Sequence, residues 1–277
     1  MVKYREIEGG IEILNTDDFD PKSILDCGQV FRYKPTDFGY ILYAGVQKVE
    51  IFCQKTIKIM CKDKNFLINY FDLNTDYAKI KLVLKKEHIL QNAIEFGKGI
   101  RILKQQPLEM IISFIISANN NIPRIKGIIE KLCVSFGEKF DDYYGFPTLE
   151  QLSKIDVEFF RSIGCGYRSE YLVSTIKLLQ GFDVNSLYTM PTHEARKALM
   201  SLKGVGRKVA DCILLFAYGK TDVFPADIWI LHAYEQLHGK NNLSALKVSE
   251  YFSKRFGKYS GYAQQYMYYA KRENNIF

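Results

Sequence analysis

The sequence predicts an α+β protein in which an N-terminal antiparallel β-sheet domain, residues 1–100, precedes a predominantly α-helical domain, residues 101–277. Two observations predict this class. Short runs of β-branched and aromatic residues, separated by turn-forming residues, fill much of the chain up to Cys61. From Pro107 onward, apolar residues recur at helical spacing instead. Because 47% of the 277 residues are hydrophobic, the chain can bury a core large enough for two units.

The first domain is expected to begin as an antiparallel meander. The predicted strands are residues 31–33, 40–43, 49–53 and 57–61. Pro35-Thr36-Asp37 and Gly45 supply the breaks between them, because these residue types favour turns. Residues 65–97 then have a helical pattern, and Gly97-Lys98-Gly99 marks the boundary between the domains.

The second domain is predicted to be a series of helices. Pro107 suits the first position of a helix, and it precedes the apolar stretch LEMIISFIISA. A second helix over 122–137 presents isoleucines on one face and ends at Gly137. The remaining predicted helices are residues 149–163, 168–180, 192–202, 207–218, 227–238, 245–256 and 260–272.

Composition limits the classes of function and location. The net charge of +7 favours an anionic partner, although a solvated lysine-rich surface explains it equally well. Six scattered cysteines without a CxxC pair argue against a disulfide framework or a zinc site. The charged start MVKYREIEGG lacks the apolar core of a secretory signal, and no apolar run is long enough to cross a bilayer. We therefore expect an intracellular monomer that does not act at a membrane.

The segment LKGVGRKVADC, residues 202–212, followed by Pro225-Ala226-Asp227, carries the most chemical information. Gly204 and Gly206 allow backbone amides to approach a phosphate closely. Lys208 is a candidate amine nucleophile, and we expect the helix N-terminus and Arg207 to lower its pKa. Asp227 is a candidate partner for a developing cation. The plainer alternatives are an exposed lysine in a first helical turn and an aspartate that only caps a helix.

These residues resemble the helix-hairpin-helix DNA glycosylases that also act as lyases, with the hairpin at about residues 195–230. SANNNIPRI (117–125) and GCGYRSEY (164–171) are similar to the eukaryotic-type 8-oxoguanine DNA glycosylases, and the resemblance covers roughly residues 25–272. It implies a bifunctional N-glycosylase and abasic-site lyase acting on duplex DNA that contains 8-oxoguanine opposite cytosine. Such an enzyme works in the nucleoid or cytoplasm of a bacterium or archaeon, or in a eukaryotic nucleus.

The resemblance also implies roles for residues of the lesion-base pocket. Lys208 would attack the sugar C1′, and Asp227 would stabilise the sugar cation and help to deprotonate the lysine. In CGQVFRY (27–33), the carbonyl of Gly28 would accept the N7–H that distinguishes 8-oxoguanine from guanine. The rest of the pocket would be formed by Cys212 and Tyr268, which stack on the two faces of the base, and by Gln264 at its Watson–Crick edge. The family usually has Phe at the position of Tyr268.

Further roles concern the opposite strand and the phosphates. By resemblance, the residues that read the orphaned cytosine would be Asn119, Arg124 and Arg168, and Tyr167 would wedge into the vacated step. Contacts to phosphate would come from Gly204, Gly206 and Trp229, where animal enzymes have His in place of the tryptophan. A structural cation is implied at the hairpin carbonyls of Met200, Leu202 and Val205. No cofactor is expected for the chemistry, and no iron–sulfur cluster, because no cysteine cluster lies near the C-terminus.

Two alternatives to this function stay open. A related glycosylase for oxidised pyrimidines would share Lys208 and Asp227 but would not need Arg124, Arg168 or Gly28 in this arrangement. A helix-hairpin-helix module that binds DNA without catalysis would have no reason to keep both Lys208 and Asp227. A hairpin fold does not by itself imply an enzyme.

Overall fold

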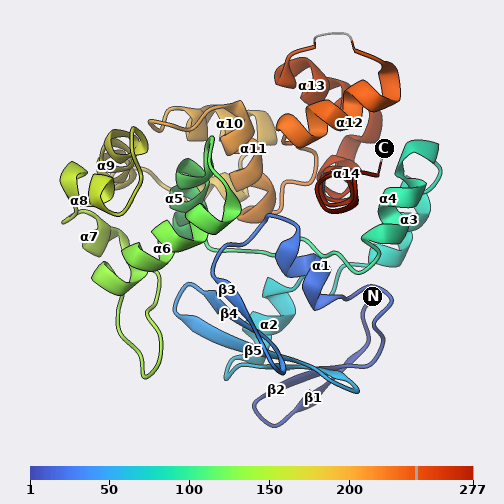
Figure 1. The fold of residues 1–277 in the computed structure, drawn as a ribbon, viewed down its shortest axis with the longest axis horizontal. Helices are drawn as coiled ribbons and strands as arrows, with labels where there is room; N and C mark the ends of the chain where they lie inside the picture. The colour runs from blue at the N-terminus through green and yellow to red at the C-terminus, as the bar shows by residue number, and fades with distance from the viewer. Residues whose placement is uncertain (241–242, 277) are drawn as a thin grey trace.

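The computed structural model of the chain describes residues 1–240 and 243–276. It confirms the predicted α+β class, with an N-terminal antiparallel sheet and a mostly helical remainder. Figure 1 shows the sheet below two groups of helices, one formed by α5 to α11 and the other by α12 to α14 together with α3 and α4. The candidate catalytic residues come from the two helical groups.

The sheet has six antiparallel strands in the order β1-β2-β6-β5-β4-β3. The strands are β1 (Tyr4–Ile7), β2 (Gly10–Ile13), β3 (Tyr33–Thr36), β4 (Gly39–Ala44), β5 (Gln47–Cys53) and β6 (Ile57–Met60). The predicted strands at 40–43, 49–53 and 57–61 are confirmed. The prediction that Pro35 and Thr36 form a break is wrong, because both belong to β3. An edge strand tolerates proline, since its outer N–H groups need no partner in the sheet.

Two elements of the N-terminal region were not predicted. The hairpin β1–β2 extends the sheet beyond β6, and Gly9 at its turn has φ +69°. Helix α1 (Pro21–Asp26) is capped by Asp20, whose carboxylate accepts from Ser23 N at 2.9 Å. The Asp-Pro pair is a recognisable start signal for such a helix. As a result Gly28 lies after a helix, at φ +77°, and not at the start of a strand as the sequence pattern suggested.

The predicted helical stretch 65–97 is divided into shorter elements. They are α2 (Lys64–Tyr70), α3 (Tyr77–Leu84), the 3₁₀ turn η1 (His88–Leu90) and α4 (Gln91–Phe96). The breaks have local causes. Asp72 adopts φ +51°, and Asp76 accepts from Lys79 N to start α3 afresh. Aspartates stop and restart helices in this way because their carboxylates bond to nearby backbone amides.

The C-terminal helices largely follow the prediction. They are α5 (Pro107–Ser117), α6 (Ile122–Phe136), α7 (Leu149–Leu152), α8 (Val157–Ser162), α9 (Arg168–Leu179), α10 (Thr192–Met200), α11 (Arg207–Phe216), α12 (Ile228–His238), α13 (Ala245–Phe256) and α14 (Ser260–Asn274), with 3₁₀ turns η2 (Ser186–Tyr188) and η3 (Gly257–Tyr259). The single helix predicted over 149–163 is two, because Asp156 caps a new start at α8. Within residues 1–240 and 243–276, no helix combines the length and apolarity that a membrane crossing requires.

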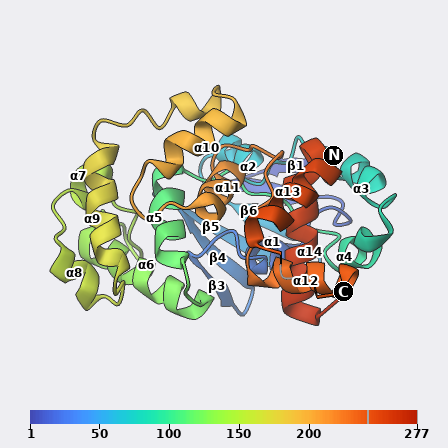
Figure 2. The same cartoon turned by 90° about the horizontal axis from the view of Figure 1, so that it is seen from above.

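Three hydrophobic cores organise the molecule. One lies between the sheet and helices α1 and α2, and a second joins α5, α6 and α9 to α10 and α11. The third packs α3 and α4 against α12, α13 and α14, so helices from both halves of the sequence share it. Figure 2 shows α14 beside α4, and α11 beside α5. Cys27 belongs to this third core, which brings the end of α1 close to α14.

An extended segment, residues 100–106, connects these cores. Arg101 is fully buried, and its guanidinium donates to the carbonyls of Phe71 (2.8 Å), Asp18 (3.1 Å), Asp72 and Thr75 (3.2 Å). Gln29 is also fully buried. It donates to Arg101 O at 2.7 Å and accepts from Leu103 N at 2.8 Å. The residues next to Gly28 are therefore held directly against this segment.

Replacement of Arg101 by Met should destabilise the protein strongly. Met nearly preserves the side-chain volume but donates no hydrogen bond, so several buried carbonyls lose their partner, each at a cost of about 1–3 kcal/mol. We expect the free energy of unfolding in urea to fall by roughly 3 kcal/mol or more. The exposed Lys98→Met is the control, with an expected change within about 0.5 kcal/mol. Equal stability of the two variants would contradict this account of Arg101.

Candidate active site

Lys208 lies in the first turn of α11, directly after the hairpin formed by residues 201–206. Gly204 adopts φ +82°, and a Cβ there would lie 2.8 Å from Cβ of Tyr171, so the turn requires glycine on both grounds. A Cβ at Gly206 would meet no described atom within 4 Å, which leaves that side of the turn open. Gly206 is the N-cap of α11 and supplies no side-chain cap, so the first amides of the helix lack that partner.

Asp227 begins α12 and approaches Lys208 from the other helical group. Its carboxylate accepts from the backbone amides of Trp229 (3.0 Å) and Ile230 (3.2 Å), which confirms the expected N-cap. The cap holds the carboxylate at the start of the helix. The same oxygen atoms face a cavity that Lys208 also lines. One side chain can therefore stabilise both the helix and a neighbouring cation.

The structure brings the two candidate catalytic residues and all the predicted lesion-base residues to one cavity. They are Lys208, Asp227, Gly28, Cys212, Gln264 and Tyr268. These six residues come from four places: the turn after α1, helix α11, the start of α12 and helix α14. The cavity measures only about 40 Å³. Sites that hold a small molecule usually measure about 300 Å³ or more, so this cavity is closed.

Tyr268 closes the cavity by packing against Gly28. A Cβ on Gly28 would lie 2.8 Å from the ring of Tyr268, so any larger residue at this position would displace the ring. Arg272 holds the tyrosine in place. Its Nη1 donates to the Tyr268 hydroxyl at 3.1 Å, and its Nη2 donates to Asp26 O. A ligand that enters between Tyr268 and Cys212 must therefore move the tyrosine ring.

The pKa of Lys208 differs from the prediction. Burial is the largest influence and lowers it, but Cys212, Asp227 and Tyr268 together raise the pKa above its ordinary value. The predicted lowering by Arg207 is wrong, because Arg207 Nε donates to Asp211 at 3.2 Å and its charge is paired there. Lys208 is therefore an ammonium at neutral pH, and it must lose a proton before it can act as a nucleophile.

The residues predicted to read the opposite base form a second group, where α5 ends and α9 begins. The buried guanidinium of Arg168 donates to the carbonyls of Ala118 (2.7 Å), Asn119 (2.7 Å) and Cys165 (3.1 Å). The exposed Arg124 donates to Gly164 O at 3.0 Å. The guanidinium of Arg168 therefore shapes the turn at Asn119, which adopts φ +49°.

Tyr167 has the exposure that a wedge requires. Its side chain is 53% exposed, and the guanidinium of Arg168 lies 4.5 Å from its ring centroid. The edge-to-face contact with Tyr171, at 5.8 Å, joins it to the residue that packs against Gly204. The wedge candidate and the hairpin are thus connected through one aromatic side chain.

The residues predicted to contact phosphate or a cation lie around the hairpin and the start of α12. Trp229 is 37% exposed, in the first turn of α12. The carbonyls of Met200, Leu202 and Val205 come from the end of α10 and the turn, and Leu202 O accepts from Val205 N at 3.2 Å. A carbonyl oxygen has a second lone pair, so this bond leaves capacity for a ligand. The cation itself stays a prediction.

Five further residues of the cavity were not singled out from the sequence. They are Cys27, Phe114, Phe216, Pro225 and Gln265. Phe114 and Phe216 stack at 5.6 Å, and Lys208 Nζ lies 5.7 Å from the Phe114 centroid. Phe114 belongs to α5, and Asn119 follows the end of this helix. Helix α5 therefore connects the cavity around Lys208 with the residues predicted to read the opposite base. Only the proximity of Gln265 to Gln264 in the sequence could have drawn attention to it.

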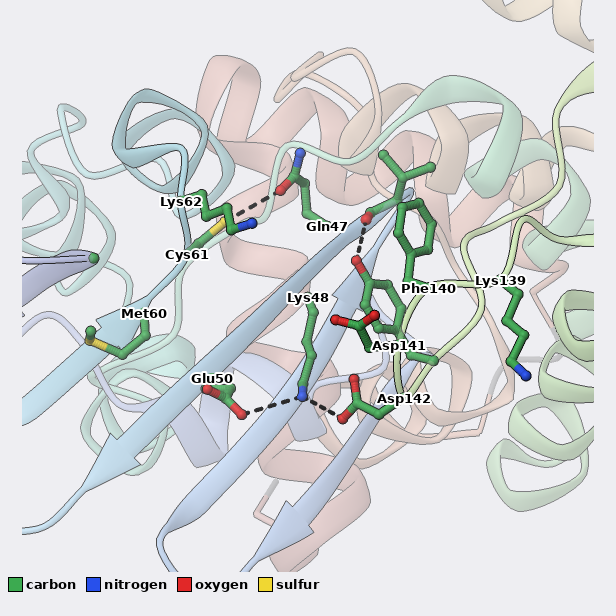
Figure 3. Close-up of a pocket in the computed structure, with 13 residues that line it drawn as sticks. Gln47, Lys48, Glu50, Met60, Cys61, Lys62, Lys139, Phe140, Asp141 and Asp142 are labelled. Carbon is green, nitrogen blue, oxygen red and sulfur yellow. Dashed lines mark hydrogen bonds and ion pairs between the residues drawn. The ribbon is translucent and has the colours of Figure 1, made fainter.

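A cavity of about 920 Å³ lies elsewhere, between β5, β6 and residues 139–143. Figure 3 shows Lys48 in this cavity between Glu50 and Asp142, at 3.4 Å and 2.6 Å. None of the predicted catalytic or base-reading residues lines it. Lys48 is already paired with two carboxylates, and size alone does not make this cavity the active site.

Two family models match the chain along almost its whole length. Residues 12–111 match the 8-oxoguanine DNA glycosylase N-terminal domain, and residues 112–258 match the HhH-GPD superfamily of base excision DNA repair proteins. The N-glycosylase/DNA lyase OGG1 of Arabidopsis thaliana is 35% identical, over 88% of this chain and 75% of its own length. The probable N-glycosylase/DNA lyase of Methanothermobacter thermautotrophicus is 29% identical, over 84% of this chain and 81% of its own length.

Solved structures give the same family. The 8-oxoguanine glycosylase/lyase of Clostridium acetobutylicum, in complex with double-stranded DNA that contains cytosine opposite 8-oxoguanine, aligns with a TM-score of 0.93. It is 35% identical and covers 100% of this chain and 99% of its own. MBOgg1 in complex with a low-affinity DNA ligand aligns with a TM-score of 0.92 at 36% identity, over 99% of both chains.

Replacement of Asp227 by Asn should lower the pKa of Lys208. The carboxylate is one of the groups that raise this pKa, so its removal weakens the opposition to burial, which lowers the pKa, and Asn still caps α12. We expect the titration midpoint to move to lower pH in an NMR titration of ¹⁵N-labelled lysine Nζ, with Lys208→Met to identify the signal. The raised pKa of Lys208 stabilises the folded protein at neutral pH, and this contribution is lost as the pH rises through that pKa. In Asp227→Asn this contribution to the free energy of unfolding should be smaller.

The control for this titration is Asp222→Asn, which removes an exposed carboxylate outside the cavity. Its Lys208 signal should titrate as in the unchanged protein. If Asp227→Asn also left the titration unchanged, the pairing of Asp227 with Lys208 would be wrong.

Proposed function

The chain belongs to the 8-oxoguanine DNA glycosylases of the HhH-GPD superfamily, and from this premise we propose how its residues carry out the reaction. The protein excises 8-oxoguanine from double-stranded DNA and is both an N-glycosylase and a DNA lyase. The observation that carries the residue assignment is the placement of Lys208 beside Asp227. Both line one cavity with the residues expected to hold the base.

Lys208 is the nucleophile of the excision step. Its amine bonds to the sugar C1′ as the glycosidic bond breaks, and the departing base takes the bonding electrons and a proton. The sugar has cationic character while this bond breaks, and the carboxylate of Asp227 stabilises it. The amine must first lose a proton, because the raised pKa of Lys208 keeps it an ammonium in the free protein. Asp227 is the neighbouring base that accepts this proton.

The lyase step follows from the bond that Lys208 forms. Ring opening of the sugar gives a Schiff base between Nζ and C1′, and this iminium makes the C2′ proton acidic. Loss of that proton and breakage of the bond from C3′ to its phosphate oxygen cut the strand by β-elimination. Hydrolysis of the Schiff base then returns Lys208 as a free amine.

The lesion enters between Cys212 and Tyr268. In the closed cavity the ring of Tyr268 lies against Gly28, so base binding moves this ring to stack on the flipped base. Once the ring has moved, the carbonyl of Gly28 is free to accept the N7–H of 8-oxoguanine. Guanine presents a bare N7 acceptor there, so the same carbonyl repels it, at a cost of about 1–3 kcal/mol.

The second group of residues recognises the strand opposite the lesion. Arg124 and the exposed Asn119 offer donors to a cytosine that has lost its partner. Arg168 holds the turn at Asn119 through three carbonyls, while each of its terminal nitrogens keeps a second N–H for the base. Tyr167 fills the step that the lesion has left.

The hairpin holds the DNA backbone. The uncapped amides at the start of α11 and the open side of Gly206 suit a phosphate, and the indole Nε1–H of Trp229 donates to a neighbouring phosphate. The carbonyls of Met200, Leu202 and Val205 are hard oxygen donors that fit a cation, and their placement on one turn supports the proposal. When bound, that cation would add positive charge near the phosphate. No chemical step depends on it.

Two alternatives to this proposal have distinct signatures. A glycosylase for oxidised pyrimidines would excise thymine glycol in preference to 8-oxoguanine, and a non-catalytic DNA-binding module would bind duplex DNA without forming a covalent adduct. The family match at 35% identity supports neither. We further propose that the protein acts as a monomer inside the cell, where chromosomal DNA lies.

Replacement of Lys208 by Gln should abolish the covalent chemistry. We expect no borohydride-trapped adduct on a duplex with one 8-oxoguanine opposite cytosine, and an excision rate lower by at least about a thousandfold. Gln is one heavy atom shorter than Lys along the side chain, keeps a polar end and offers no nucleophilic amine. The exposed Lys177→Gln, on α9, should trap normally. Full base excision by the Lys208 variant would disprove the nucleophile assignment.

Replacement of Arg124 by Met should relax the preference for cytosine opposite the lesion. A side chain that reads one base edge contributes about 1–3 kcal/mol of discrimination, so the ratio of single-turnover rates opposite cytosine and adenine should fall about tenfold. Lys131→Met, an exposed position on the same helix α6, is the matched control. An unchanged ratio in Arg124→Met would remove Arg124 from opposite-base recognition.

A further inference from the structure

Two consecutive glutamines of α14 line the active-site cavity, and their amides are bonded to each other. Gln264 is 5% exposed and Gln265 is 2% exposed. Gln265 Nε2 donates to Gln264 Oε1 at 2.8 Å. Adjacent residues of a helix project in different directions, so this contact requires both side chains to bend toward one place. That place is the cavity which Lys208 and Asp227 share.

The bond between the amides determines what each offers to a ligand. Gln264 Oε1 already accepts from Gln265, which leaves Gln264 Nε2 to donate. Gln265 Oε1 is fully buried and has no hydrogen-bond partner among the described residues. Buried polar atoms are almost always paired in native proteins, so an unpaired acceptor at the wall of a binding cavity points to a ligand that completes it. The pair therefore presents one donor and one acceptor.

The Watson–Crick edge of 8-oxoguanine has the complementary pattern. It carries an acceptor at O6, a donor at N1 and a donor at the 2-amino group. Gln264 Nε2 and Gln265 Oε1 are not hydrogen-bonded to each other, so they stay at least at van der Waals distance. Neighbouring groups on the base edge lie closer together than that. The two atoms therefore suit the two ends of the edge better than two adjacent positions. The donor then matches O6, and the acceptor matches the 2-amino group.

We propose that Gln265 determines specificity for the lesion base: its Oε1 accepts from the 2-amino group, while its Nε2 holds Gln264 so that Gln264 Nε2 donates to O6. This inference rests on the proposed function, since it concerns the base that Lys208 releases. The two amides orient each other. If both turned over, Gln265 would present N–H to the 2-amino group and donor would meet donor. A guanine-type edge therefore selects one orientation of the pair.

The test compares two lesions that differ only in the 2-amino group. Single-turnover excision is measured on duplexes that carry 8-oxoguanine or 8-oxohypoxanthine opposite cytosine. We expect the unaltered protein to prefer 8-oxoguanine by about tenfold or more, because a site built to bond a polar group discriminates against an analogue that lacks it. In Gln265→Met the preference should shrink to within about twofold, through a loss of rate on 8-oxoguanine alone.

The matched control is Tyr266→Phe. Tyr266 follows Gln265 in α14, its hydroxyl is also buried without a partner among the described residues, and it does not line the cavity. This variant should keep the full preference for 8-oxoguanine over 8-oxohypoxanthine. That result would show that the loss of a buried polar atom from this helix does not by itself reduce the preference. The preference is a ratio within one protein, so a partly unfolded sample leaves it unchanged.

Three outcomes would overturn the inference. Equal rates on the two lesions in the unaltered protein would mean that the 2-amino group is not read. Equal losses on both lesions in Gln265→Met would make Gln265 a packing residue, and an undiminished preference in that variant would assign the contact to another group. Failure of the unaltered protein to excise either base would instead disprove the proposed function itself.

Discussion

The buried hydrogen bonds of residues 100–106 are the constraint on which the arrangement of the site depends. Arg101 bonds this segment to the carbonyls around Phe71, and Gln29 bonds it to the turn after α1. On its other side, Gln105 N donates to Phe216 O at 2.8 Å, at the end of α11. The turn that carries Gly28 and the helix that carries Lys208 are thus held by one short stretch of backbone. This stretch therefore links two elements that lie far apart in the sequence and line one cavity.

The electrostatics of the cavity favour the protonated form of Lys208, the proposed nucleophile. An isolated buried ammonium would lose its proton, but the neighbouring groups of Lys208 reverse that tendency and raise its pKa. The carboxylate of Asp227 is held in turn by two amides of α12. The helix cap therefore orients the group that favours the protonated lysine and that, in the proposed mechanism, accepts its proton. Asp227 can thus cap α12 and serve the proposed chemistry from the same position.

The closed state of the cavity suits an enzyme that must reject most of the bases it meets. Tyr268 occupies the space beside Gly28, and Arg272 holds its hydroxyl. A flipped base enters only if its contacts compensate for the loss of this packing. The amide oxygen of Gln265 has no partner among the described residues, and by our proposal a guanine-type base supplies one. The walls of the cavity thus take part in selection before Lys208 reacts.

Hydrophobic periodicity and short motifs are local properties of the chain, so they were enough to predict the α+β class and most helices after Pro107. They also singled out Lys208, Asp227 and Gln264, which the structure brings to one cavity. The sequence by itself did not show that Pro35 lies inside an edge strand, that Gly28 follows a helix, or that Arg207 is paired with Asp211. The raised pKa of Lys208, the closed cavity and the contact between Gln264 and Gln265 become visible only in the folded protein. These properties arise from charges and side chains brought together from distant segments, and no local pattern contains the distances between them.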